Sequence, residues 1–457
     1  MCYDIIVIVL VSWKGLFPMI KNSYTAGILT LGCKVNQYES EAIAETLAAS
    51  GISILPHTAV CDIYIINTCT VTAESDRKAC QFIRRAIQKN PSAYILVTGC
   101  LAEVDANRIA GISGVDYICG NTNKLSVCDA AFDLLTLGHK LTTPKIELKP
   151  LSNAPFERMT ISRFDRTRAY VKIEDGCESK CTYCIIPHAR GNIRSKPMQD
   201  IINEVTELTR GGCREVVLTG IETASYGKDL ENTDLATLLS EVDKIEGIGR
   251  VRLGSLDPSL ITPSFVNKIK GLRSLAPHFH LSLQSGSSRV LALMKRKYNA
   301  DMAMRGIELL RANIPNVKFT TDVIVGFPSE TDEDFEETLK FAKKAEFLMI
   351  HVFPYSKRKG TPAAEMPSQV PSNIKRSRAE TLSNTAKNIR AELLEKNICD
   401  SPVCDVLFET FSDGAAHGHT SDFIEVEVKS DKPLHSEFHK VRLTSTDGNI
   451  CFGVLDE

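Results

Sequence analysis

The sequence has no apolar run long enough to span a membrane, no strong net charge and no cysteine spacing typical of disulfide-rich proteins. The apolar run near the start, Ile5–Val11, is far shorter than the roughly 20 residues that cross a membrane. The net charge is −2, so any surface that binds RNA must be a local basic patch. The fifteen cysteines do not follow the spacing of a disulfide framework. We therefore expect a cytoplasmic protein without a membrane partner, whose reduced thiols include metal ligands.

The chain is long enough for several globular domains. It has 457 residues, of which 43% are hydrophobic and 24% are charged, as in ordinary folded proteins. Residues 1–23 are predicted to be an extension, within which Met19 is an alternative translation start to Met1. Three domains of α/β class overall are predicted beyond it, over residues 24–140, 163–394 and 395–457.

The first predicted domain alternates short apolar strands with amphipathic helices. Strands are expected over Gly27–Leu31, Asp62–Asn67 and Ala93–Thr98, and a helix over Tyr38–Ser50. This alternation is typical of a parallel sheet with helices on its faces.

One cysteine follows each of these strands by two residues: Cys33, Cys69 and Cys100. Because parallel strands end at the same edge of a sheet, the three thiols can converge on one metal site there. Cysteine is also a small core hydrophobe, which would explain any one of them alone. The shared register of all three favours ligation.

The second predicted domain repeats the strand–helix unit about six times after the connector Leu141–Arg166. Its expected strands are Ala169–Ile173, Glu215–Thr219, Arg250–Gly254, His280–Leu283, Phe319–Val325 and Leu348–Phe353. Six parallel strands predict an open, partial (β/α)6 barrel with its catalytic groups at the carboxyl ends of the strands. A laterally open barrel suits a macromolecular substrate.

The third predicted domain contains only short β segments. They are Val403–Glu409, Phe423–Val428, Lys440–Leu443 and Ile450–Leu455, with turn residues between them. This pattern predicts a small antiparallel β-barrel. A charged helix over about Lys375–Lys396 is expected to lead into it.

The most informative motif is the C-x3-C-x2-C run formed by Cys177, Cys181 and Cys184. It follows the first strand of the second domain, so it would lie at the mouth of the barrel. Zinc prefers four ligands, and no fourth follows at zinc-finger spacing. Three thiolates on a 4Fe-4S cluster leave one iron open for a ligand from outside the protein. Reductive cleavage of S-adenosylmethionine requires such an open iron, so we interpret these cysteines as catalytic.

The run Gly176–Gly191 resembles the signature of radical SAM enzymes, and in particular of their methylthiotransferase branch. The tail resembles a TRAM domain, the small RNA-binding β-barrel of that branch. Further segments are similar to its other conserved blocks: Gly32–Gln37, Asn67–Thr72, Gly99–Cys100, His280–Gly286, Met294–Tyr298 and Asp322–Thr331.

This resemblance implies two 4Fe-4S clusters, with Cys33, Cys69 and Cys100 as ligands of the second, and S-adenosylmethionine as cofactor. Residues 32–40 resemble the branch that converts N6-threonylcarbamoyladenosine beside the tRNA anticodon to its 2-methylthio form. The implied partners are the tRNA anticodon loop and an electron donor such as flavodoxin or ferredoxin. The sulfur source stays unidentified.

Five residues are candidate contacts of S-adenosylmethionine, each with a plainer alternative. Gly220 stands where the superfamily contacts the amino-acid part of the cofactor, although a strand-end glycine needs no such role. Ser282 and Gln284 share one face of a strand and would point into the barrel if their leucine neighbours point outward. Asp322 could bind ribose hydroxyls or a backbone group. Tyr183 could cover the cluster or simply pack.

Two basic runs are candidate RNA contacts on the barrel rim, although such runs are usually solvated faces. They are Lys295, Arg296, Lys297 and Lys357, Arg358, Lys359. His351, His417 and His419 have no partner at metal-ligand spacing and are expected to be structural or surface residues.

Two alternatives remain open at this stage. A sibling enzyme would use the same chemistry on isopentenyladenosine in tRNA or on an aspartate of a ribosomal protein. A non-catalytic iron–sulfur protein that binds RNA or transfers electrons would never form 5′-deoxyadenosine from S-adenosylmethionine.

Overall fold

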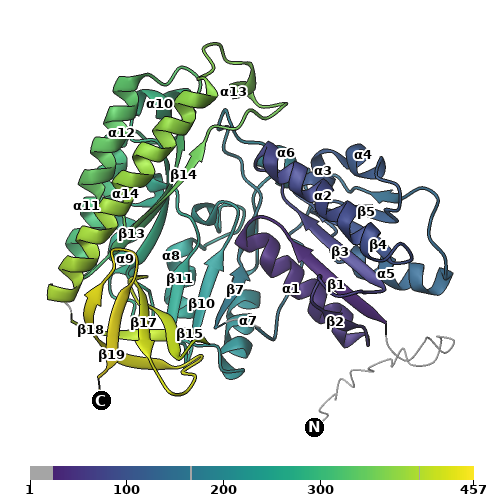
Figure 1. Cartoon of the computed structure of the whole chain (residues 1–457), viewed down its shortest axis with the longest axis horizontal. Helices are drawn as coiled ribbons and strands as arrows, with labels where there is room; N and C mark the ends of the chain where they lie inside the picture. Colours follow the sequence, from purple (N-terminus) through teal and green to yellow (C-terminus); the bar gives the residue numbers. More distant parts are fainter. Residues whose placement is uncertain (1–23, 165–166, 401, 457) are drawn as a thin grey trace, which may run out of the picture.

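The computed structural model describes residues 24–164, 167–400 and 402–456. The prediction for residues 1–23 lies outside the described residues. Figure 1 shows three parts in chain order: an α/β sandwich in purple and blue, a strand–helix barrel in teal and green, and a small β-barrel in yellow. The α/β fold class predicted from the sequence is confirmed.

The N-terminal part contains a six-stranded parallel sheet in the order β2-β1-β3-β4-β5-β6. The strands are β1 Thr25–Thr30, β2 Ser53–Leu55, β3 Ile63–Thr68, β4 Tyr94–Gly99, β5 Tyr117–Cys119 and β6 Lys145–Glu147. Strands β3 and β4 are buried along their whole length, which explains their continuous runs of isoleucine, leucine and valine.

Helices cover both faces of this sheet. On one face pack α1 (Lys34–Ala49) and α5 (Ser126–Leu137), and on the other α2 (Ala73–Lys89), α3 (Cys100–Val104) and α4 (Ala106–Ala110). The sequence placed the start of α1 four residues too late, because the motif that follows Cys33 is polar although its Val35 and Asn36 are buried.

The central part holds six parallel strands in two sheets, β7-β10-β11 and β12-β13-β14. Their bounds are β7 Arg168–Lys172, β10 Glu215–Thr219, β11 Arg250–Leu253, β12 His278–Gln284, β13 Lys318–Val325 and β14 Met349–Pro354. A parallel bridge between Leu256 and Leu281 joins the two sheets. Among the described strands none pairs β14 with β7, so the barrel is open on that side, as predicted.

The barrel is covered on its outside by helices. They are α7 Met198–Arg210, α8 Leu235–Val242, α9 Pro263–Ile269, α10 Ser288–Leu293, α11 Ala300–Asn313 and α12 Asp332–Ala345. The long helix α14 (Ser372–Asp400) runs beside α12 and packs along β14 before the chain enters the C-terminal part. Shorter elements are β8 Glu174–Asp175, β9 Arg194–Ser195, α6 Ile186–Arg190 and α13 Pro362–Glu365.

The C-terminal part is a closed five-stranded barrel in the order β15-β16-β17-β19-β18. Its strands are β15 Val403–Ser412, β16 Ala415–Thr420, β17 Glu425–Lys429, β18 Phe438–Thr446 and β19 Cys451–Leu455. The predicted small β-barrel is confirmed, and four of its five strand pairs are antiparallel as expected, but β17 and β19 pair in parallel. A closed ring with an odd number of strands must contain at least one parallel pair. The sequence also missed β16, whose alanines, glycine and histidines lack the usual strand residues.

The small barrel closes the end of the central barrel where its strands begin. Phe423 stacks on His278 with ring centroids 4.5 Å apart and on His419 at 4.9 Å. The guanidinium of Arg252, on β11, lies 4.9 Å from the same ring. These contacts close the barrel at that end. None of the described helices combines the length and apolar character needed to cross a membrane.

Candidate functional site: two cysteine triads beside one cavity

The loop after β8 carries Cys177, Cys181 and Cys184 at the carboxyl end of the barrel. Each sulfur accepts an N–H hydrogen bond. The backbone N–H of Ser179 donates to Cys177 and that of Ile186 to Cys184, both at 3.4 Å. A guanidinium nitrogen of Arg296, from the segment after α10, lies 3.2 Å from the sulfur of Cys181. Such donors stabilise the negative charge that a thiolate ligand carries.

The second triad forms at the carboxyl edge of the N-terminal sheet. Cys33 follows β1, Cys69 follows β3, and Cys100 follows β4 as the first residue of α3. The three thiols are close enough for their charges to interact. Gly32 makes this approach sterically feasible, because it has φ +101° and a Cβ there would lie 2.7 Å from that of Cys69.

The spacing of the sulfurs fits iron–sulfur clusters better than single ions. Among the described residues, only His280, Asp322 and His351 bring three ligand atoms within 4.8 Å of one another, and neither cysteine triad is that tight. Two sets of soft thiolate donors held apart suit a larger group with several irons. Burial raises the pKa of both Cys69 and Cys184 to about 11, so binding of metal has to displace their protons.

A buried charge network connects the two triads. Arg190, on α6 just beyond Cys184, is fully buried, and its Nε lies 3.3 Å from the sulfur of Cys100. Its Nη1 lies 2.7 Å from Glu39 of α1 and 3.1 Å from Asp175. Burial alone would raise the pKa of Glu39, but Arg190 and two further cations, Lys124 and Lys172, hold it well below its usual value. The N-terminal sheet and the barrel are thereby fixed to each other beside both thiol sets.

A cavity of about 640 Å³ occupies the inside of the barrel. Its walls are the loop Gly32–Val35 with Cys33, the inner faces of the six barrel strands, and His419 and Phe423 of the C-terminal barrel. Gly220 also lines it, two residues before Glu222, whose carboxylate accepts a hydrogen bond from the Cys177 thiol at 3.1 Å. The cavity therefore extends from one triad towards the other.

The candidate S-adenosylmethionine contacts lie in different surroundings. Gly220 and Asp322 line the cavity. A Cβ at Gly220 would meet Glu174 Oε2 at 2.6 Å, so packing also requires this glycine. Ser282 and Gln284 are half-buried, while their leucine neighbours are buried in the core. Neither is among the residues that line the cavity, so their contact with S-adenosylmethionine stays a prediction. Tyr183 packs edge-on against Phe327 at 6.4 Å, in a small apolar cluster beside the cysteine loop.

Two arginines of the basic runs do not lie on the barrel rim, where they were predicted to be. Arg296 pairs with Asp257 at 2.8 Å as well as contacting Cys181. Arg358 is 8% exposed and pairs at 2.6 Å with Asp76 of α2. Neither can meet a phosphate, because each already neutralises a buried carboxylate.

The four lysines of these runs are exposed. They are Lys295, Lys297, Lys357 and Lys359. Lys297 forms an ion pair with Glu222 at 3.4 Å, so it faces the Cys177 side of the cavity.

The sequence missed a polar group inside the barrel. His280 Nε2 lies 3.2 Å from Asp322 Oδ2, and the rings of His280 and His351 are 5.9 Å apart. His351 was expected to be a structural or surface residue because no partner stands near it in sequence. Its partners come from the neighbouring strands β12 and β13. Burial lowers the pKa of His351, which keeps its ring neutral near pH 7.

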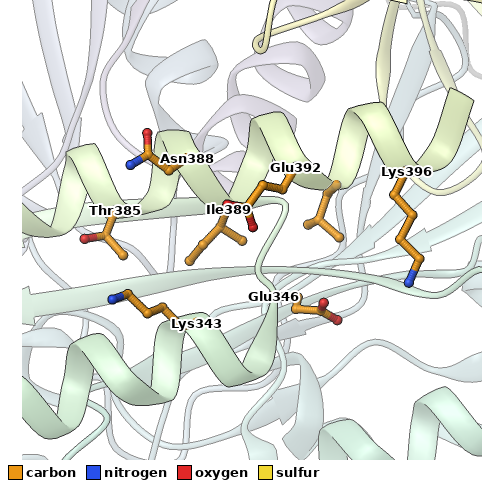
Figure 2. Close-up of a pocket in the computed structure, with 8 residues that line it drawn as sticks. Lys343, Glu346, Thr385, Asn388, Ile389, Glu392 and Lys396 are labelled. Atoms are coloured by element: carbon orange, nitrogen blue, oxygen red, sulfur yellow. The ribbon is translucent and has the colours of Figure 1, made fainter.

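A second hollow lies outside the barrel, between the end of α12 and the middle of α14 (Figure 2). Its lining mixes both signs of charge, with Lys343 and Glu346 on one helix and Glu392 and Lys396 on the other. No cysteine lines it, and we assign it no part in the chemistry.

Comparisons with known proteins agree with this geometry. Residues 171–342 match the Radical SAM superfamily, and residues 25–120 match Uncharacterized protein family UPF0004. A solved radical S-adenosylmethionine methyltransferase, TsrM from Kitasatospora setae, shares the fold with TM-score 0.53 and 13% identity over 75% of this chain and 77% of that one.

Curated relatives cover nearly the whole chain. The threonylcarbamoyladenosine tRNA methylthiotransferase MtaB of Bacillus subtilis is 37% identical over 92% of this chain and 93% of its own. MtaB of Thermotoga maritima is 37% identical over 92% and 94%. The tRNA-2-methylthio-N(6)-dimethylallyladenosine synthase of Carboxydothermus hydrogenoformans is 36% identical over 80% and 84%. With these matches and its two cysteine triads, the chain belongs to the radical SAM methylthiotransferase family.

Proposed function

We propose that this enzyme converts N6-threonylcarbamoyladenosine in tRNA to its 2-methylthio derivative. The observation that carries the proposal is the pair of cysteine triads that the buried Arg190 network connects, with Cys33 of one triad lining the barrel cavity. The MtaB relatives, which match over about nine-tenths of the chain, support this substrate. The synthase specific for dimethylallyladenosine is the sibling alternative.

Each part of the chain has a proposed task. Residues 24–140 hold the auxiliary cluster through Cys33, Cys69 and Cys100. Residues 163–394 hold the cluster that binds S-adenosylmethionine, through Cys177, Cys181 and Cys184. Residues 395–457 contact the RNA, together with the exposed lysines 295, 297, 357 and 359. Reduced thiols in this number fit a cytoplasmic enzyme.

The proposed reaction replaces the hydrogen on adenine C2, which acid–base catalysis cannot remove. When bound, the two 4Fe-4S clusters and S-adenosylmethionine supply the radical, the sulfur and the methyl group for this replacement. A reductant such as flavodoxin or ferredoxin would supply the electron, and the sulfur source stays unidentified.

The side chains of this chain bind and orient the reactants and exclude water from the site. Arg190 and Arg296 each hold one cysteine sulfur through an N–H donor. Phe423 and its ring partners close the base of the cavity against water. Gly220, Ser282, Gln284, Asp322 and Tyr183 are proposed to position S-adenosylmethionine.

Nucleoside mass spectrometry of tRNA from cells that lack this gene tests the substrate. We expect 2-methylthio-threonylcarbamoyladenosine to disappear and to return when the wild-type chain is supplied, but not when Cys177→Ala is supplied. An unchanged level of this nucleoside, with loss of the 2-methylthio-isopentenyl form instead, would assign the enzyme to its sibling group.

A further inference from the structure

The base of the barrel cavity contains a polar pocket in which only Asp322 has so far been given a part, as a proposed contact of S-adenosylmethionine. We name Lys34, His280, Asp322 and His351 the basal pocket. Resting on the proposed function, we propose that this pocket recognises the threonylcarbamoyl group of the substrate, with Lys34 as the partner of its carboxylate. Lys34 is thus a specificity-determining residue.

Neighbouring strands place three of these side chains together. Asp322 of β13 stands opposite His351 of β14 in the register of the sheet. His280 of β12 contacts Asp322 at 3.2 Å, and its Nδ1 lies 2.9 Å from the hydroxyl of Thr320. These contacts fix the ring of His280 and leave His351 with ring nitrogens free for a ligand.

Lys34 enters the pocket from the other side, directly after Cys33. It lines the cavity, and its charge interacts with those of Asp322, Arg168 and Arg252. Both arginines are neutralised by buried Glu215, at 3.4 and 2.7 Å. In the part of the chain that the structure describes, no side chain forms a hydrogen bond or ion pair with the ammonium of Lys34. A cation without a partner inside a cavity is suited to an anionic ligand.

The same charges argue against a metal ion in the pocket. Two histidines and a carboxylate within 4.8 Å would suit a divalent cation by geometry alone. However, the ammonium of Lys34, which no described carboxylate neutralises, would repel it. An anionic group that also offers hydrogen-bond donors fits both the cations and Asp322.

The threonylcarbamoyl group has this combination. Its carboxylate matches Lys34, and its hydroxyl and urea N–H groups match the acceptor Asp322 and the neutral ring of His351. An isopentenyl group offers none of these atoms and would leave the pocket's polar groups unpaired. Sites built to hydrogen-bond a substrate reject analogues that lack the partner much more strongly than apolar pockets do.

The test uses the full-length, iron-loaded enzyme and three anticodon stem-loop RNAs that differ only in one adenosine. One carries threonylcarbamoyladenosine, one its threonine carboxamide, and one isopentenyladenosine. Dissociation constants come from fluorescence anisotropy, and methylthio products from mass spectrometry. Lys34→Met removes the charge, Lys34→Arg keeps it, and Lys340→Met on the outer face of α12 is the matched control.

We expect the wild type, Lys34→Arg and Lys340→Met to bind the carboxylate RNA about 10- to 100-fold more tightly than the carboxamide. Lys34→Met should lose that ratio because its affinity for the carboxylate RNA falls. His351→Phe, on the opposite wall of the pocket, should weaken binding of both RNAs that carry the urea group, the carboxylate RNA and the carboxamide RNA. Its iron content should equal that of the wild type. A wild-type ratio in Lys34→Met would overturn this inference while leaving the proposed function intact. Failure of the wild type to modify the carboxylate RNA, with product only on the isopentenyl RNA, would instead overturn the proposed function.

Discussion

The Nε of Arg190 lies 3.3 Å from the sulfur of Cys100, although the two residues belong to different domains. Arg190 stands six positions after Cys184 in sequence, so one short segment serves both cysteine triads. Its guanidinium also pairs with Glu39 at 2.7 Å at the domain interface. Arg190 is therefore one of the buried cations, with Lys172, that fix the relative position of the two triads.

Arg190→Ala should strongly destabilise the chain. It would leave Glu39 and Asp175 buried with fewer cations, and breaking a buried ion pair typically costs about 3–5 kcal/mol. Urea unfolding followed by circular dichroism measures the loss. Arg77→Ala, which removes an exposed pair with Glu74 on α2, should leave the unfolding midpoint unchanged. Equal midpoints for Arg190→Ala and wild type would show that the network does not hold the domains together.

Arg296→Gln should make the cluster at Cys177, Cys181 and Cys184 harder to reduce. Its N–H···S bond to Cys181, at 3.2 Å, stabilises the more negative, reduced state. Loss of one such hydrogen bond should lower the midpoint potential by about 30–60 mV.

A redox titration followed by electron paramagnetic resonance gives this potential. Arg289→Gln is the matched control, because Arg289 pairs with Asp334 and not with any cysteine. The same potential in Arg296→Gln and wild type would rule out a tuning role for the guanidinium.

Docking of the C-terminal barrel should weaken in acid because of Glu409. Burial tends to raise the pKa of Glu409, but its contacts with His419 and Arg168 lower it to about 2. A group with a depressed pKa stabilises the fold above its unfolded pKa and loses that contribution as pH falls towards the folded value. The stabilisation by Glu409 is thus present above about pH 4.5 and fades towards pH 2.

Glu409→Gln measures this contribution directly. The side chain is a quarter exposed, so solvent screening reduces the expected difference in free energy of unfolding to about 1–2 kcal/mol at about pH 5. Urea unfolding of the cluster-free wild type and variant should show this gap, and the gap should shrink at about pH 3. A gap that grows in acid would contradict the assignment.

Local pattern was sufficient to predict the six barrel strands, the three longest strands of the N-terminal sheet and the two cysteine triads, but not β2, β5, β6 or β16. Cys33, Cys69 and Cys100 follow apolar runs at one register, and parallel pairing brings such positions to one edge. The prediction that Arg296 and Arg358 lie on the surface was wrong, because their carboxylate partners, Asp257 and Asp76, lie far away in sequence.

The basal pocket could not be predicted from the sequence for the same reason, because its residues lie far apart along the chain. His280, Asp322 and His351 meet through the register of three strands, and Lys34 approaches from another domain. Each residue alone has an ordinary explanation in the sequence. Only the three-dimensional arrangement of the strands and of the N-terminal part shows that they share one cavity.

One measurement tests the two-cluster account most directly: 5′-deoxyadenosine and methylthio product, quantified together on the threonylcarbamoyladenosine stem-loop RNA. For the triple variant Cys33→Ala, Cys69→Ala, Cys100→Ala we predict about half the iron of the wild type, continued formation of 5′-deoxyadenosine, and no methylthio product. Cys399→Ala, at an exposed thiol outside both triads, should match the wild type in all three. Methylthio product from the triple variant would contradict the account.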